Sequence, residues 1–377
     1  MDELGIQDWQ LPDDIWDIGI YDAHCHPVDN YKKLPAGLKN LRTSKLTVMA
    51  TRLDDQHKVH EAALQFPDRV VPSFGYHPWF THLLYASSTP PESKSQHYRS
   101  VLFPEPTDKF LDLLPDPVSL HEFIKDLTIN FERHPYALLG EVGIDRSFRL
   151  PKSGKQVTYE LPDSDDEQPS RSENECCEQD KKRLSPYRVT LDHQKQVLLA
   201  QLAVAGKYDR SVSLHGVQAH GVLFEIFNEL WSDFHVPTKK ERKMNKDEKT
   251  QIADTGGNAS SATPSFPTRV CLHSYSGPPD QITLWINKRK VPARIYFSFS
   301  VLINQRYGEK FKKVVHAVPD DRLLVETDFP LAGEKMQALQ AHIVSVVCEI
   351  KGWKLDEGVK ILKRNWNEFV YGESSAL

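Results

Sequence analysis

Short apolar segments alternate with amphipathic segments along almost the whole chain of 377 residues, and this alternation limits the possible folds more than any other feature. It is typical of repeated strand and helix units, which build parallel sheets. Eight segments qualify as strands, and this count favours a closed (β/α)8 TIM barrel over an open doubly wound α/β sheet. The candidate strands are residues 18–21, 46–50, 70–74, 137–140, 211–214, 269–272, 294–298 and 322–325.

Apolar residues recur every three to four positions between these strands, which predicts helices on the outside of the barrel. We predict that residues 1–377 form a single TIM-barrel domain. The expected helices include residues 120–131, 197–205, 222–231 and 311–318, followed by 336–350 and 359–369, which complete the outer ring.

Three segments interrupt the pattern. Residues from about 149 to 185 and from about 237 to 267 are charged or polar and poor in core-forming side chains, so we expect two long disordered insertions. Residues 87–117 are rich in Pro and Ser, and we expect a structured loop over the barrel mouth. The basic run at 239–246 and the Cys176–Cys177 pair fall inside the insertions, where solvated surface explains them more simply than nuclear targeting or metal binding.

Charge and cysteine usage exclude several classes of protein. A formal charge of −5 and a pI of 6.4 leave no broad basic surface for nucleic acid, so an anionic substrate has to be held locally. The five cysteines are scattered and odd in number, which fits a reducing compartment. Because neither a secretory signal nor a membrane-spanning stretch is evident, we expect a cytoplasmic or nuclear protein that is not secreted.

Polar residues gather where the predicted strands end, which is where barrel enzymes place their reactive groups. An HxH pair alone is weak evidence, although side chains two apart in an extended segment can approach one ion together. Histidines or carboxylates at the ends of five of the eight strands are not explained by chance. The candidate metal ligands are His24, His26, Glu141, His215, His273 and Asp328.

Four imidazoles and two carboxylates are too many for one tetrahedral ion that keeps an open position, but they suit two ions that share a bridging carboxylate. Glu141 is the natural bridge. The mixed nitrogen and oxygen set predicts two divalent cations. Zinc, manganese and cobalt fit this set better than magnesium, which usually prefers oxygen ligands alone.

The ordered set of motifs resembles the TatD-like metal-dependent deoxyribonucleases, a branch of the amidohydrolase-like barrels. The resemblance spans nearly the whole chain, and the two insertions make it most similar to a fungal member. It is carried by DAHCHP at 22–27, GYHPW at 75–79, GEVGID at 140–145, SLHG at 213–216, LHSYSG at 272–277, ETDFP at 326–330 and NWNEFVYG at 365–372.

The resemblance implies a two-metal exonuclease that cleaves phosphodiester bonds of DNA with a metal-activated water. Glu141 and Asp328 are then catalytic carboxylates, with Asp328 accepting the proton of the water, and His77 assists as an acid or a phosphate contact. The ligand sets that the family pattern implies are His24, His26 and Asp328 for one ion and His215 and His273 for the other, with Glu141 between them.

Two departures from the family pattern bear on the substrate. Val217 stands where relatives often carry arginine, and Trp79 stands where they often have a second histidine. Candidate replacements for these phosphate contacts are His77, Arg146 and His220. The plainer interpretation of His77 is a structural histidine, and that of the other two is loop surface.

Two alternatives to a nuclease stay open. An amidohydrolase-type enzyme for a small-molecule ester or amide would suit the less cationic mouth that Val217 and Trp79 create. A barrel scaffold that binds a protein partner through its charged insertions is the second alternative. Convergence of Lys and Arg side chains on the metal site would favour DNA as the substrate.

Overall fold

The computed structural model describes residues 9–154, 184–232, 234 and 265–372, and its centre is one parallel sheet of eight strands. The strand order is β1-β2-β3-β7-β9-β10-β11-β12, so strands that follow one another around the sheet also follow one another along the chain. These strands are β1 (Tyr21–Cys25), β2 (Lys45–Met49), β3 (Val70–Phe74), β7 (Leu138–Asp145), β9 (Val212–Val217), β10 (Arg269–Leu272), β11 (Arg294–Phe299) and β12 (Leu323–Val325).

The residues that follow β12 bring it back to β1 and complete the ring. The backbone amide of Asp328 donates to the carbonyl of His24, and the amide of His26 donates to the carbonyl of Phe329, each over 3.0 Å. The buried Asp22 carboxylate also accepts hydrogen bonds from the amide of Thr327 at 3.1 Å and its hydroxyl at 2.6 Å. The predicted (β/α)8 barrel is therefore confirmed. Hydrogen bonds made by the residues after β12 and by the Asp22 side chain join β12 to β1.

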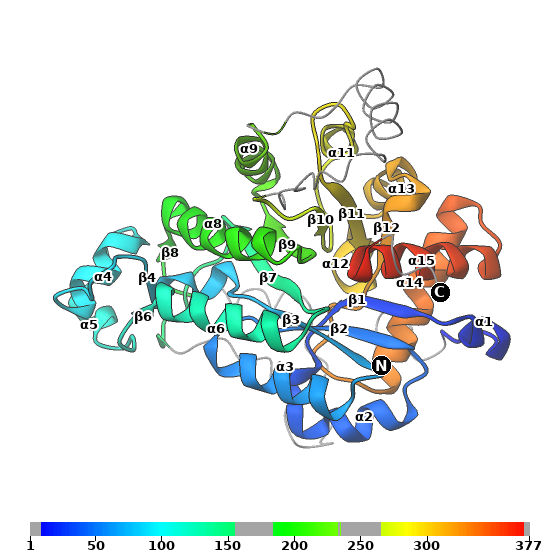
Figure 1. The fold of residues 1–377 in the computed structure, drawn as a ribbon, viewed down its shortest axis with the longest axis horizontal. Coiled ribbons are helices and arrows are strands. Elements are labelled where there is room, and N and C mark those ends of the chain that lie inside the picture. Colours follow the sequence, from blue (N-terminus) through cyan, green and yellow to red (C-terminus); the bar gives the residue numbers. More distant parts are fainter. Residues whose placement is uncertain (1–8, 155–183, 233, 235–264, 373–377) are drawn as a thin grey trace, which may run out of the picture.

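Helices surround the strands, and α3, α6 and α8 lie along the outside of β2, β3 and β7 (Figure 1). All six helices expected from apolar spacing are present. The helices are α1 (Asp13–Ile18), α2 (Leu34–Asn40), α3 (Leu53–Gln65), α4 (Lys94–Val101), α5 (Asp108–Leu111), α6 (Leu120–Arg133), α8 (Leu191–Lys207), α9 (His220–Leu230), α11 (Pro279–Trp285), α12 (Val301–Asn304), α13 (Glu309–Ala317), α14 (Glu334–Lys351) and α15 (Leu355–Tyr371).

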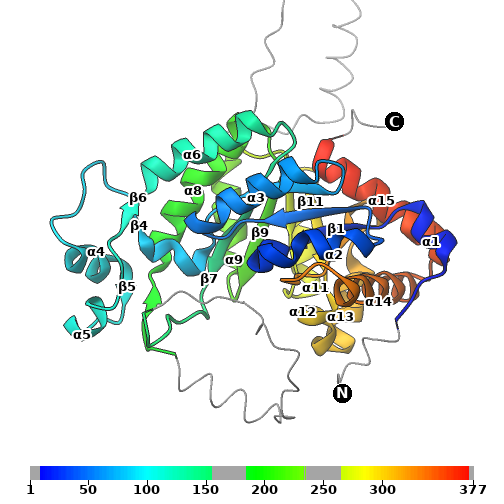
Figure 2. The ribbon, with the colours of Figure 1, turned by 90° about the horizontal axis from the view of Figure 1, so that it is seen from below.

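Helix α15 covers the end of the barrel where the strands begin, and α1 lies beside it in both views (Figures 1 and 2). Its Trp366 donates an indole hydrogen bond to the hydroxyl of Thr47 in β2 at 3.1 Å. Residues of six strands pack against this helix and fill the barrel interior at this end. That cluster is Ala23, Val71, Leu138, Cys271, Tyr296 and Leu324 from the strands with Trp366, Phe369 and Val370 from the helix.

Three predicted strand boundaries are wrong, and one of them is the end of the strand predicted at 211–214, since β9 continues to Val217. Residues 13–18 form α1, which ends before Gly19 at a φ of 100°, so β1 begins at Tyr21 and contains His24. Strand β7 continues to Asp145 because its pairing with β9 extends to the Asp145–Val217 position, so Glu141 lies inside a strand rather than after one.

The segment 87–117 is not a loop over the barrel mouth. It contains α4 and α5, which project away from the strands (Figure 1). The Ser93 hydroxyl caps α4 by accepting from the amide of Gln96. Its apolar side chains, among them Tyr98, Leu102, Phe110 and Leu114, form a small separate core with Tyr187, which explains why the segment folds beside the barrel.

Most of both predicted insertions falls at residues 155–183 and 235–264, which lie outside the described residues together with Cys176, Cys177 and the basic run at 239–246. The described residues on the two sides of the first insertion pair with each other, since the backbone amide of Ser185 donates to the carbonyl of Leu150 at 2.8 Å. A single domain over residues 1–377 stays a prediction. Within the described ranges, no helix is long and apolar enough to cross a membrane.

Candidate metal centre

The six predicted ligands meet at the end of the barrel where the strands finish, around the carboxylate of Glu141. Its Oε2 atom lies 3.5 Å from His24 Nε2 and 3.3 Å from His26 Nε2. Asp328 Oδ1 lies 3.4 Å from His26 Nε2 and 3.7 Å from His24 Nε2. One oxygen of Glu141 therefore faces the β1 histidines, with Asp328 beside them.

The other oxygen of Glu141 faces three different imidazoles. Its Oε1 atom lies 2.7 Å from His215 Nδ1, 2.9 Å from His273 Nε2 and 3.1 Å from His77 Nε2. The two carboxylate oxygens thus separate the histidines into two sets. All six predicted residues are brought together, and His77 joins them.

The spacing of these atoms fits divalent ions. Ligands about 2.1 Å from one ion lie about 3.4 Å apart in a tetrahedron and about 3.0 Å apart along an octahedral edge. Within the described residues, three groups could each hold an ion, and Glu141 belongs to two of them. The groups are His24 with His26 and Asp328, His24 with Glu141 and His273, and His77 with Glu141 and His215.

Ser213 on β9 orients two of the histidines. Its hydroxyl lies 2.8 Å from His24 Nδ1 and 3.2 Å from His273 Nδ1, and a hydroxyl oxygen can accept from both rings. When both Nδ1 atoms carry the proton, both Nε2 atoms present lone pairs toward Glu141. Such outer hydrogen bonds fix the tautomer that a metal ligand needs.

Asp145, which was not among the predicted site residues, orients the ring of His215. Its Oδ2 atom lies 3.3 Å from His215 Nε2 and accepts from the Trp79 indole at 2.6 Å. Asp145 ends β7, four residues after Glu141, so the two side chains lie on the same face of the strand. This period-two spacing within GEVGID is the signal that could have identified it.

His77 differs from the other histidines in its tautomer. The Trp79 backbone amide donates to His77 Nδ1 at 3.2 Å, so the proton of a neutral ring resides on Nε2, the atom that faces Glu141. Burial lowers the pKa of His77 to about 4, which keeps the ring neutral at physiological pH. The ring therefore offers a hydrogen-bond donor toward the site rather than a lone pair.

The buried carboxylates are held in their charged form by the imidazoles. Burial favours the neutral carboxyl of Glu141, but His77, His273 and His24 outweigh it and hold its pKa well below the usual range. Burial opposes the charge of Asp328 too, and its hydrogen bond to His26 lowers the pKa to about 2. Both carboxylates therefore carry a negative charge.

Protonation differs among the imidazoles when no ion is bound. Burial lowers the pKa of His24 to about 3. Burial also acts against the charged form of His215, but hydrogen bonds to Asp145 and Glu141 outweigh it and raise the pKa to about 10. Interactions with Asp328 and Glu141 likewise overcome burial and raise the pKa of His26 well above its usual value. An incoming ion has to displace the protons on these two rings.

Local backbone geometry places two of these residues. Asp328 adopts a φ of 52°, a left-handed conformation that Asp tolerates better than most residues, and it follows directly on the turn that closes the barrel. At Gly143, a φ of 154° leaves no room for a side chain, because a Cβ atom there would lie 2.0 Å from the carbonyl oxygen of His215. The close approach of β7 and β9 brings Glu141 and His215 into contact.

A cavity of about 410 Å³ opens onto the centre and contains two arginines that sequence reasoning missed. Arg52 is 7% exposed, lies over the Phe80 ring and contacts Asp54 at 2.7 Å. Arg306 lies over the ring of Tyr307. Neither Arg146 nor His220 is among the residues that line this cavity, and His220 instead contacts the hydroxyl of Ser276 at 3.3 Å.

Comparisons with known proteins agree with this geometry. The family described as TatD-related DNase matches residues 21–370. The Cut9-interacting protein scn1 of Schizosaccharomyces pombe is 35% identical over 93% of this chain and 98% of its own length. The uncharacterized deoxyribonuclease YMR262W of Saccharomyces cerevisiae is 27% identical over 86% of this chain and 91% of its own length.

Solved structures support the fold. The TatD homologue YJJV of Escherichia coli superposes with a TM-score of 0.52 at 17% identity, over 93% of this chain and 97% of its own. An uncharacterized amidohydrolase from Saccharomyces cerevisiae gives a TM-score of 0.53 at 13% identity, over 93% and 99% of the two chains. At such identities the likeness concerns the fold alone.

Proposed function

Because this chain belongs to the TatD-related DNase family, we propose that it is a two-metal deoxyribonuclease that hydrolyses phosphodiester bonds at the ends of DNA strands. The observation that carries the proposal is the position of Glu141, whose Oε2 faces His24 and His26 while Oε1 faces His215 and His273. A carboxylate placed in this way suits a bridge between two divalent cations.

In this proposal each ligand set holds one ion. Two bound ions would lower the pKa of water towards neutrality and offset negative charge on the phosphoryl oxygens. The fixed tautomers of His24, His273 and His215 prepare the nitrogen lone pairs for this role. The proposed ligands are His24, His26 and Asp328 for one ion and His215 and His273 for the other, with Glu141 shared.

Two further roles fall to side chains of the centre. The Asp328 side chain is 21% exposed to the cavity, and its low pKa keeps it ionised as a proton acceptor for the attacking water. The Nε2 hydrogen of His77 is placed to donate to a phosphoryl oxygen. A neutral imidazole is a weak acid, so hydrogen bonding to phosphate suits His77 better than proton transfer.

The arginines favour a phosphate-bearing substrate over a neutral amide or ester. Arg52 and Arg306 line the cavity, and guanidinium groups bind phosphate oxygens in a bidentate manner. They supply the positive charge that Val217 and Trp79 do not. A cavity of about 410 Å³ has the size of a small-molecule site, so it suits the end of a strand better than a duplex.

A nuclease assay with end-labelled single-stranded DNA and added manganese, magnesium or zinc tests this proposal. We expect nucleotides to be released from one end, and Arg306→Gln to raise KM about tenfold with little change in kcat. The matched control is Arg289→Gln, at an exposed position outside the cavity. Hydrolysis of neutral esters or amides with no cleavage of DNA would contradict the proposal in favour of a small-molecule hydrolase.

A protein partner is a second candidate function, because the relative at 35% identity is named for its interaction with Cut9. We propose that the charged insertions at about 149–185 and 237–267 would provide the contact, since charged segments of this composition bind partners well. Deleting residues 155–183 tests this by affinity measurement against a candidate partner. Binding that survives the deletion, while nuclease activity is lost, would contradict it.

A further inference from the structure

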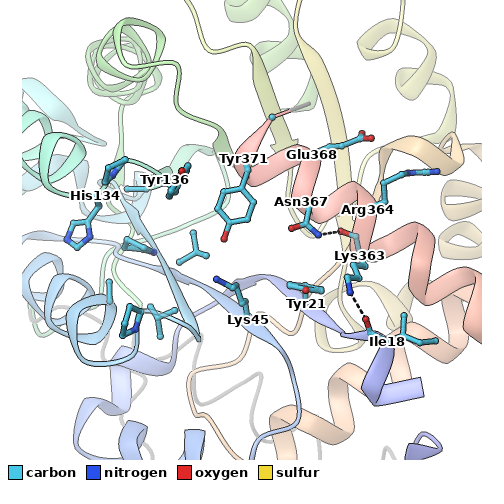
Figure 3. Close-up of a pocket in the computed structure, with 18 of the residues that line it drawn as sticks. Ile18, Tyr21, Lys45, His134, Tyr136, Lys363, Arg364, Asn367, Glu368 and Tyr371 are labelled. Atoms are coloured by element: carbon cyan, nitrogen blue, oxygen red, sulfur yellow. Dashed lines mark hydrogen bonds between the residues drawn. The ribbon is translucent and has the colours of Figure 1, made fainter. Parts of the chain in front are cut away.

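A second cavity lies at the opposite end of the barrel, where the strands begin (Figure 3). Its volume is about 1250 Å³, and its walls come from the starts of β1, β2 and β3, the segment before β7 and the last turns of α15. It shares no lining residue with the cavity of the metal centre.

Positive charge dominates this amino-end cavity, in a chain whose formal charge is −5. Among the described residues that line it, the only carboxylate is that of Glu368, which is already paired with Arg294 at 2.6 Å. Across the described residues, no carboxylate forms an ion pair with Lys45, Lys363 or Arg364. The lining cations are Lys45, Lys360, Lys363 and Arg364.

Lys45 is the cation at the centre of this space. Figure 3 shows its amino group pointing towards the Tyr371 ring, whose hydroxyl points back towards it, while Arg364 and Glu368 point away on the other side of α15. Lys363 donates to the carbonyl of Ile18 at 2.7 Å. Lys45 has no such partner in the described part of the chain, so its ammonium group is available to an anion.

An aromatic surface stands beside this cation. The Tyr136 side chain is 62% exposed, and its ring lies 5.1 Å from that of Tyr371 at an interplanar angle of 87°. Tyr371 is fixed in turn by an edge contact with the buried Trp366 at 5.7 Å. The two rings are perpendicular and Tyr136 is largely exposed, which leaves ring surface for a planar ligand.

We propose that the amino-end cavity binds a nucleoside phosphate, either free or as the last residue of a single strand. The phosphate lies between the ammonium group of Lys45 and the hydroxyl of Tyr371, and the base stacks on Tyr136. A basic groove beside an exposed aromatic ring is the combination that binds single-stranded nucleic acid. An acidic peptide would use the cations but would leave the stacking surface of Tyr136 without a role.

Calorimetric titration of the full-length protein with dAMP tests this site, because a mononucleotide contains no phosphodiester bond to hydrolyse. We expect Lys45→Gln and Tyr136→Ala each to weaken binding about tenfold. Lys39→Gln, at an exposed position in α2, is the matched control and should bind as the wild type does. Binding that is lost in Lys45→Gln and Tyr136→Ala but kept in Arg306→Gln, a variant of the other cavity, belongs to the amino end.

A 5′-phosphorylated hexathymidylate distinguishes the two sources of the ligand. Binding of the strand but not of dAMP, with the same loss in Lys45→Gln and Tyr136→Ala, assigns the site to strand ends. The proposal is overturned if neither variant changes nucleotide binding, if inorganic phosphate binds as tightly as dAMP, or if only a glutamate-rich peptide binds.

Two controls keep these outcomes clear. Tyr136 is largely exposed, so its variant tests the site even if Lys45→Gln lowers stability. Because the titration involves no turnover, its failure would leave the nuclease proposal untouched, and the reverse also holds.

Discussion

The two ends of this barrel present polar side chains in opposite ways. At the carboxyl end, Glu141 and His24 are at most 5% exposed, and other side chains hold each of them by hydrogen bonds. At the amino end, Lys45 faces an open cavity without a partner in the described residues. The side chains of the carboxyl end are therefore held in position when no ligand is bound. At the amino end, solvent partly screens the charge of the cation.

This contrast implies different sensitivities to substitution. Loss of one buried partner leaves other charged groups unpaired in a medium of low polarity, which is costly. Loss of a solvated cation changes an interaction that is already weakened by water and salt. Substitutions at the carboxyl end should therefore have the larger effects.

The largest expected effect among single substitutions of similar size is that of Asp328→Asn. It removes a charged ligand and the proposed proton acceptor, and we expect kcat on single-stranded DNA to fall about a thousandfold. The matched control is Asp126→Asn, at an exposed position in α6. A loss of less than tenfold would remove Asp328 from the mechanism.

A smaller loss of function is expected for Ser213→Ala. The Ser213 hydroxyl is not a proposed metal ligand, but it orients the rings of two of them. Without its hydroxyl, the tautomers of His24 and His273 are no longer fixed, and metal affinity should fall about ten- to a hundredfold. Ser345→Ala, in α14, is the control, because the Ser345 hydroxyl donates only to the carbonyl of its own helix. Equal metal affinities of the two variants would show that the Ser213 hydroxyl does not help to bind the metal.

Metal affinity should also rise with pH. The pKa of His215 is raised to about 10 in the folded protein, so this ring carries a proton at neutral pH that a metal ion must displace. Affinity should increase about tenfold per pH unit for each proton displaced, and calorimetry in buffers of different ionisation enthalpy should detect proton release. Binding without proton release would contradict the raised pKa of His215.

The same pKa shift has the opposite consequence for the metal-free protein. A histidine whose folded pKa lies above its unfolded value stabilises the fold below pH 6.5, and this stabilisation is lost as pH rises through about 10. Thermal melting of the metal-free chain between pH 6 and pH 10 should therefore show a falling melting temperature. His215→Gln should flatten this dependence.

The smallest expected effect lies at the amino end. Lys45→Gln should leave kcat and KM on single-stranded DNA within about twofold of the wild type, because its cavity shares no residue with the metal centre. Steady-state kinetics at matched protein concentration measure this. A large loss of kcat would show that the two ends are coupled.

Sequence patterns predicted that the six candidate ligands lie close together, because these residues stand at fixed places on the strands, and the structure brings them together. Their positions at the ends of predicted strands indicate that His24, Glu141 and His215 lie at one end of a parallel barrel. The same patterns misplaced the first strand, because residues 18–21 are apolar enough for a strand although Ile18 ends α1 and Gly19 follows it at a φ of 100°. Periodicity does not reveal which short apolar run ends in a tight turn at glycine.

Contacts between distant segments were beyond the reach of these patterns. Arg52 comes from the segment between β2 and α3 and Arg306 from the short 3-10 helix after α12, and their approach to the cavity depends on how these segments pack. Ser213 and Asp145 act through hydrogen bonds whose geometry is set only in the folded barrel. The amino-end cavity likewise depends on Lys45 and Tyr371, which lie far apart in sequence.

The central claim is that Glu141 joins two ions in one centre, and metal analysis tests it most directly. Purified wild type and Glu141→Ala would be compared for bound metal per chain by mass spectrometry and for cleavage of single-stranded DNA. We predict about two ions and cleavage for the wild type, with loss of both in the variant. A variant that keeps both ions, or a wild type that binds none, would contradict the account.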